Sequence, residues 1–241
     1  AQQRALDRAG AAADAECEAQ AFSGLADVLY ADGRMPSAYA AFGRCVALCD
    51  REGLTRFSLN NRCMLAIVHS YLVPADAAVP LLDDVRAVAR GLRHRAAEVM
   101  ADETEGWVRV MQGRCQDALV PTERSLAQAR SIVSRRWVLF DLALLAFAYW
   151  QVDRREEARA ALREAFALTD DVGYRFVGGL LHGARAMMVE RAGDLAAVLA
   201  DGERTLAAGC PAHCHFWFRR YAIDAALAHG DFACASAQAD A

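Results

Sequence analysis

Small residues recur every 40 residues along this 241-residue chain, and this recurrence restricts the possible folds more than any other feature of the sequence. One column of small residues comprises Ala26, Ala66, Gly106, Ala146 and Ala186, and a second, twelve residues later, comprises Ala38, Ala78, Ala118, Ala158 and Val198. A column of turn positions between them comprises Gly33, Val73, Gly113, Asp153 and Gly193. A fixed period of this kind indicates a repeat architecture, in which each unit buries its apolar face against its neighbours.

Each unit has the pattern of two helices joined by a short turn. In the first unit, apolar residues from Phe22 to Leu29 follow the i, i+3, i+4, i+7 spacing of one helical face. Gly33 is suited to the left-handed conformation that ends a helix, and Pro36 lies where the first turn of the next helix tolerates proline. The small residues are expected where paired helices cross, because a missing side chain lets two backbones approach each other.

The sequence therefore predicts an all-α fold, a right-handed superhelical solenoid of antiparallel helix pairs. The expected pairs occupy residues 16–52, 55–92, 95–132, 135–171, 174–208 and 213–241, within a single repeat domain over residues 1–241. Residues 1–13 are expected to form the second helix of an earlier unit, so the chain is interpreted as a fragment of a longer polypeptide.

The segment GLADVLYADGRMPSAYAAFGRC resembles the tetratricopeptide consensus, with Leu25, Ala26, Gly33, Ala38 and Phe42 at its marked positions. The 40-residue period is longer than that of a typical tetratricopeptide repeat and is similar to that of tetratricopeptide-like arrays in large bacterial signalling proteins. Within this group, residues 213–232 look most like the C-terminal repeats of ATPase-linked class III adenylate/guanylate cyclases. Thr122 and Gly202 replace the large residue found at Phe42, which predicts less regular packing in the third and fifth units.

The resemblance implies a non-catalytic protein-interaction or regulatory scaffold that binds a peptide or partner domain on its concave face. An alternative is the sensor or regulatory arm of a nucleotidyl cyclase-ATPase or of an ATP-dependent transcriptional activator. In that case the catalytic or DNA-binding domains would lie outside this segment. A third hypothesis is a receptor that binds a small molecule in the interior of the solenoid.

Partner contacts are expected on the first helix of each pair, which lines the concave surface of such solenoids. Arginine and aromatic side chains are the residue types that dominate interface hot spots. The candidates on these helices are Arg109, Tyr149, Arg175, Arg185, Trp217, Arg219 and Arg220. A groove of this composition suits an acidic or C-terminal peptide of a protein partner, or another domain of the same chain.

Composition and motifs argue against several other classes of protein. A net charge of -4 and a pI near 5.9 are not those of a nucleic-acid binder. The sequence has neither a signal peptide nor an apolar run of membrane-spanning length, so a cytoplasmic location without membrane contact is expected. No phosphate-binding glycine loop is present, and adjacent acids such as Asp83 and Asp84 do not face each other on a helix. Neither catalytic residues nor a cofactor is therefore expected.

One cluster resembles a set of metal ligands, namely Cys210, His213, Cys214 and His215. Zinc is held by four nitrogen or sulfur ligands, usually from two separated pairs, and no second pair lies at the required spacing. The preferred interpretation is a helix that starts at Pro211 and directs Cys214 inward, with no metal. The eight cysteines fall mostly in apolar stretches, where a free thiol behaves as a small hydrophobic side chain.

Overall fold

The protein is described by a computed structural model over residues 14–73, 78–173 and 177–241. Within these ranges the regular structure is entirely α-helical and contains no strand, so the predicted all-α class is confirmed. The helix expected over residues 1–13 lies outside the described residues. In the same ranges, no helix combines the length and the apolar character needed to cross a bilayer.

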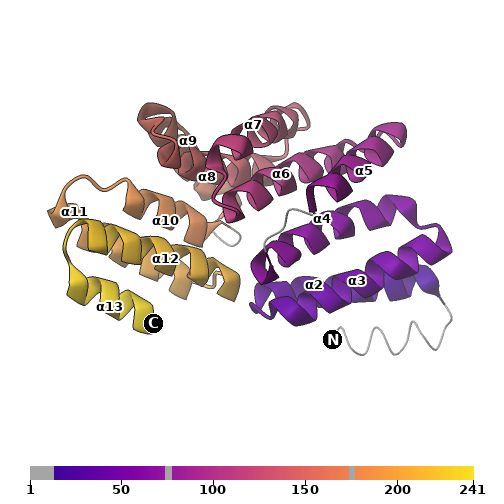
Figure 1. The fold of residues 1–241 in the computed structure, drawn as a ribbon, viewed down its shortest axis with the longest axis horizontal. Helices are drawn as coiled ribbons and strands as arrows, with labels where there is room; N and C mark the ends of the chain where they lie inside the picture. Colours follow the sequence, from indigo (N-terminus) through magenta and orange to yellow (C-terminus); the bar gives the residue numbers. More distant parts are fainter. Residues whose placement is uncertain (1–13, 74–77, 174–176) are drawn as a thin grey trace. The chain divides into compact units, whose positions relative to one another are not determined.

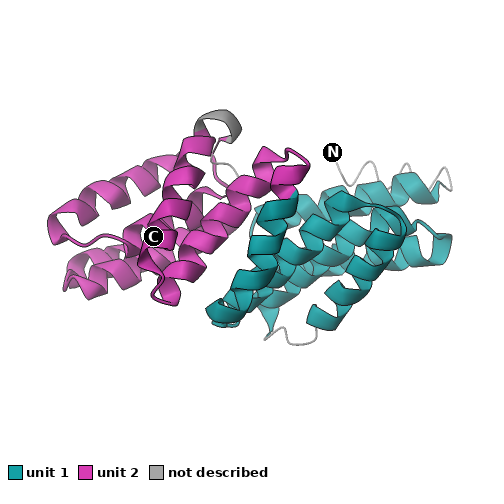
Figure 2. Ribbon diagram, turned by 90° about the horizontal axis from the view of Figure 1, so that it is seen from above, with its two compact units in different colours: residues 1–128 teal, residues 129–241 magenta. Residues whose placement is uncertain are grey.

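The chain divides into two compact units, residues 1–128 and 129–241 (Figure 2). Unit 1 contains α2 (Ala15–Ala31), α3 (Met35–Glu52), α4 (Thr55–Leu72), α5 (Ala78–Gly91), α6 (Arg95–Met111) and most of α7 (Cys115–Ser131). Helices that follow one another in the sequence pack together, as α2 does with α3 and α5 with α6 (Figure 1).

Unit 2 contains α8 (Arg135–Gln151), α9 (Arg155–Val172), α10 (Gly178–Met187), α11 (Ala192–Ala207), α12 (Ala212–Ala228) and α13 (Phe232–Asp240). Here too the pairing is sequential, with α8 against α9, α10 against α11 and α12 against α13 (Figure 1). The helix pairs expected of a repeat protein are therefore present, while the right-handed superhelical path and the single repeat domain stay predictions.

The small-residue columns lie in the packed interior, as the sequence predicted. The four alanines of the first column are at most 2% exposed, and Gly106 is buried with them. In the second column the most exposed member is Val198, at only 8%. Each column therefore marks a site where a helix presses against its neighbour and a larger side chain has no room.

The predicted turn column holds in three of its five positions. Gly33 and Gly113 have φ values of 74°, and Asp153 has a φ of 62°, which are left-handed conformations that close a helix. Val73 and Gly193 do not follow this prediction. Val73 is an extended residue that follows α4, and Gly193 lies inside α11, because the turn before α11 comes earlier, after α10 ends at Met187.

A second turn series lies at the predicted breaks between helix pairs, although its left-handed conformation was not predicted from the sequence. It comprises Gly53, Arg93, Val133 and Gly173, which are again 40 residues apart and all have positive φ. These residues separate one helix pair from the next. The left-handed conformation of Arg93 and Val133 is not apparent from the sequence, because neither is a residue type that favours it.

Two glycines of α10 lie in close contact with α12. A Cβ atom added to Gly179 would lie 1.8 Å from the carbonyl oxygen of Cys214, and one added to Gly183 would lie 2.8 Å from the Tyr221 ring. Gly202 of α11 has a similar role, since a Cβ there would lie 2.2 Å from the ring of the fully buried Phe218. The Phe218 ring therefore fills the space that a large side chain at position 202 would otherwise occupy.

We expect Gly179→Ala to destabilise the protein by on the order of 3 kcal/mol, because the new methyl group overlaps the backbone of α12. Gly43→Ala is the matched control. Gly43 lies inside α3 with no atom within 4 Å of an added Cβ, so alanine should stabilise that helix by about 1 kcal/mol. Urea unfolding followed by circular dichroism measures both changes, and equal unfolding free energies would contradict the close approach.

Ala146→Asp should be severely destabilising, by on the order of 3 kcal/mol or more, because it overpacks the interior and buries a carboxylate. Ala146 is 0% exposed in α8. Ala160→Asp places the same side chain on the exposed face of α9 and should cost about 0.5 kcal/mol or less. Thermal melts of the two variants test the predicted columns, and similar melting temperatures would contradict them.

Candidate functional site

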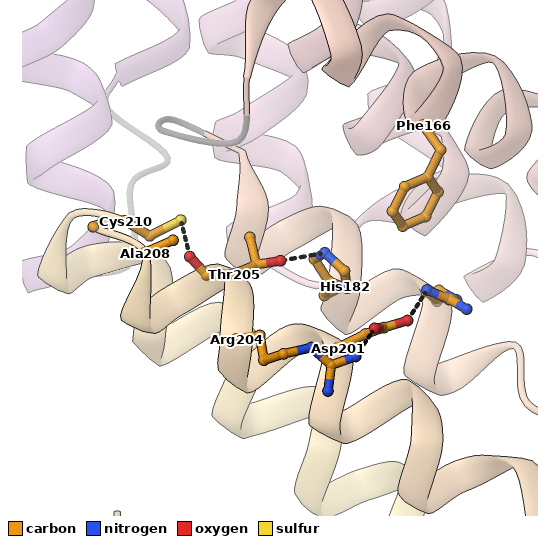
Figure 3. A pocket seen from close by; sticks show the side chains of 9 residues that line it. Phe166, His182, Asp201, Arg204, Thr205, Ala208 and Cys210 are labelled. Atoms are coloured by element: carbon orange, nitrogen blue, oxygen red, sulfur yellow. Dashed lines mark hydrogen bonds and ion pairs between the residues drawn. The ribbon is translucent and has the colours of Figure 1, made fainter.

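A pocket of about 450 Å³, with charged side chains in its lining, lies among three helices of unit 2 (Figure 3). Its lining comes from α9, α10, α11 and the turn that follows α11. The lining residues are Phe166, His182, Arg185, Asp201, Arg204, Thr205, Ala208, Gly209 and Cys210. A concave site with a few convergent polar groups is the usual form of a ligand-binding site.

Helical spacing explains why these side chains converge. His182 and Arg185 are three residues apart on α10 and therefore share a face. Asp201, Arg204 and Thr205 share a face of α11 in the same way. Gly209, with a φ of 109°, turns the chain after α11 and brings Cys210 back to the pocket, where its Sγ donates to the carbonyl oxygen of Thr205 over 3.5 Å.

Two guanidinium groups share one carboxylate in this pocket. Arg185 Nη1 donates to Asp201 Oδ2 over 3.0 Å, and Arg204 donates to Oδ1 of the same side chain. The hydrogen bond from Arg185, together with the charges of both arginines, holds the pKa of Asp201 below its usual range. Asp201 is therefore ionised at neutral pH, and the three side chains together carry a charge of +1.

The floor of the pocket is a buried histidine. His182 is 3% exposed, and its Nε2 lies 3.0 Å from Thr205 Oγ1 (Figure 3). Burial and the nearby positive charge of Arg185 lower the pKa of His182 to about 4, so the imidazole is neutral at pH 7. The Phe166 ring meets the His182 ring edge-on, with centroids 5.3 Å apart, and the Arg185 guanidinium lies 5.5 Å from the centre of the Phe166 ring.

Among the described residues that were predicted to contact a partner, Arg185 lines this pocket. Arg219 is instead tied to Glu203 and Gln238, and Arg220 is exposed with its guanidinium 5.9 Å from the Tyr221 ring centre. Arg175 lies outside the described residues.

Two further candidates lie elsewhere, and one candidate is buried. In unit 1, Arg109 lies 3.6 Å from Glu105, its i−4 neighbour on α6. In unit 2, the half-buried Tyr149 ring has the Arg154 guanidinium 4.3 Å from its centre. Trp217 was a candidate partner contact, but it is 2% exposed in unit 2, so it is not a surface contact in this structure.

The cluster of cysteines and histidines at the start of α12 does not assemble a metal site. Among the described residues, no three His, Cys, Asp or Glu side chains are grouped so that they could hold an ion. Cys214 Sγ lies 3.6 Å from His213 Nε2, and burial raises the pKa of the Cys214 thiol to about 12. A thiol that stays protonated is a poor ligand. None of the eight cysteines, all of which lie within the described ranges, forms a disulfide.

Unit 1 contains a buried ion-pair network that the sequence did not reveal. Asp102 is 1% exposed, and it accepts hydrogen bonds from Arg86 Nε and Arg124 Nε, both at 2.6 Å, and from Gln128 Nε2 at 3.1 Å. Arg86 also bonds to Asp83 and Glu105. Because the oxygens of Asp102 are saturated by donors, this carboxylate is suited to joining α5, α6 and α7, not to moving protons.

The sequence did not indicate Phe166, Asp201, Arg204 and Thr205, because partner contacts were expected on first helices, whereas α9 and α11 are second helices. His182 lies on the first helix α10 but is not a residue type that dominates interface hot spots. The spacing of Asp201, Arg204 and Thr205 on one face of α11 was the available signal. It did not reveal that α10 places Arg185 beside this face.

Comparison with protein-family models and with curated proteins finds no match for this chain. The likeness to tetratricopeptide repeats and to cyclase-linked arrays therefore stays a prediction. The helical fold and the pocket are established by the structure alone.

The lowered pKa of His182 predicts a specific loss of stability in acid. The unfolded chain takes up a proton near pH 6.5, whereas folded His182 resists it until about pH 4. Stability should therefore fall as the pH falls through this window, with His182 accounting for on the order of 2 kcal/mol by pH 4.5. Urea unfolding at pH 7 and pH 4.5 should show a smaller loss for His182→Gln than for the wild type, and equal losses would contradict a buried neutral imidazole.

Proposed function

We propose that this protein is a non-catalytic interaction or regulatory scaffold that binds a peptide or a partner domain, with the unit 2 pocket as its recognition site. The observation that carries the proposal is the pair of partly exposed arginines beside an aromatic ring. The side chains of Arg185 and Arg204 are 38% and 70% exposed, and Phe166 lies next to Arg185. Arginine and aromatic side chains in one concave site supply both the charge and the contact area of an interface hot spot.

The chemistry of the pocket favours binding over catalysis. Thr205 and His182 form a hydroxyl–imidazole pair of the kind found in nucleophilic catalysis, but a base with a pKa of about 4 is poorly matched to proton transfer at neutral pH. The charge of Arg185 is one cause of this low pKa, because it opposes the imidazolium that such a step would create. Burial raises the pKa of the Cys210 thiol, which lowers its value as a nucleophile.

The excess positive charge indicates the kind of partner. Asp201 neutralises one of the two guanidinium groups, and a segment with an acidic residue would neutralise the other. An acidic peptide is accordingly the preferred partner. The alternative role, as the sensor arm of a cyclase-ATPase or transcriptional activator, depends on sequence beyond these residues and stays a prediction.

Binding of capped acidic peptides tests the proposal. Arg185→Gln should weaken their binding about tenfold, because it removes charge-assisted hydrogen bonds worth about 1.5 kcal/mol. Arg154→Gln is the matched control, since Arg154 is also a half-exposed, ion-paired arginine beside an aromatic ring of unit 2, but outside the pocket. Fluorescence anisotropy with peptide arrays of acidic, neutral and basic composition measures the effect. The proposal fails if no acidic peptide binds, or if the two variants lose binding equally.

A further inference from the structure

The charged side chains that line the unit 2 pocket are two arginines and one aspartate, with a net charge of +1. Each oxygen of Asp201 is taken by one guanidinium, Oδ2 by Arg185 and Oδ1 by Arg204. No other acidic side chain is among the described residues that line the pocket. His182 is neutral at pH 7, so the lining has room for one further negative charge before it becomes net negative.

Both arginines retain N–H donors that can bind this further negative charge. A guanidinium has five N–H donors in a planar fork. Within the described part of the chain, Arg185 and Arg204 each have one hydrogen bond to Asp201 and no other. The remaining donors match the two oxygens of a carboxylate, which arginine binds in a bidentate fashion.

The Phe166 ring adds a second requirement for a ligand of this pocket. Phe166, on α9, lines the same pocket (Figure 3), and the Arg185 guanidinium lies 5.5 Å from the centre of its ring. A planar group attached close to the carboxylate would contact both this ring and the guanidinium plane. Thr205 and His182 then supply hydrogen-bonding groups at the floor.

We propose that this pocket accepts a single carboxylate held beside a planar group, such as a glutamate next to an aromatic residue in a partner segment, and that Asp201 excludes doubly charged phosphate. The inference rests on the proposed partner-binding function and names the chemistry of the partner. Asp201 is thus a specificity-determining residue as well as a structural link between Arg185 and Arg204.

The selectivity follows from the shared carboxylate. Any anion that bonds both arginines lies close to Asp201, because the same two groups already hold that side chain. A monoanionic ligand completes the neutralisation of the pocket, whereas a phosphate dianion places a second, uncompensated charge beside Asp201. Replacement of Asp201 by asparagine raises the charge of the lining from +1 to +2, which matches a dianion.

The experiment uses the whole chain and three peptides that differ at one position. They are acetylated and amidated peptides with glutamate, glutamine or phosphoserine directly before phenylalanine, so that neither terminus supplies a charge. Isothermal titration at pH 7.5 should give the tightest binding for the glutamate peptide. The glutamine and phosphoserine peptides should each bind about tenfold more weakly.

Asp201→Asn should reverse the preference between the glutamate and phosphoserine peptides. Asp201→Glu keeps the charge and should keep the wild-type preference, which separates charge selectivity from a purely structural role. An unchanged preference in Asp201→Asn, or tighter binding of phosphoserine by the wild type, overturns the inference. Circular dichroism melts establish that each variant is folded.

Failure of this inference is distinguishable from failure of the partner-binding proposal. If all three peptides bind with equal strength and Arg185→Gln weakens each of them, the pocket is a partner site without the stated selectivity. If none of them binds the wild type and the acidic peptide arrays are also negative, both proposals fail.

Discussion

The close approach of helices at small residues is the constraint on which the rest of this structure depends. Where Ala26, Ala66, Ala146 and Ala186 are packed against their neighbours, the absence of larger side chains sets the distance between backbones. At Gly179 the approach is so close that even a methyl group has no place. This contact fixes α10 against α12, and α10 in turn supplies Arg185 and His182 to the pocket.

The sequence predicted the fold well wherever a feature is local or repeats. The helix class follows from apolar spacing, and the buried columns follow from their period. The turn at Gly33 was recognised because glycine favours its backbone conformation. At Arg93 and Val133 the break between helix pairs was predicted but the left-handed conformation was not, because the flanking helices impose it against the preference of the residue type.

The candidate site was predicted only in part, because it depends on how helices are rotated relative to one another. Arg185 was found by its residue type and helix, but its partner Asp201 lies on a different helix. Of the adjacent aromatics of α12, Phe216 is 48% exposed, whereas Trp217 is buried. A run of consecutive aromatic residues has no internal periodicity from which its exposed member can be identified.

The buried thiols give each unit its own reporter of local opening. Burial raises the pKa of Cys63 in unit 1 and of Cys214 in unit 2 to about 12, so neither is a thiolate in the folded protein. An alkylating reagent reaches them only when the surrounding helices separate, and the rate of modification then measures that separation. Because Cys214 lies on the helix that holds α10, a ligand in the pocket that steadies α10 would slow alkylation at Cys214 while Cys63 reacts at its former rate.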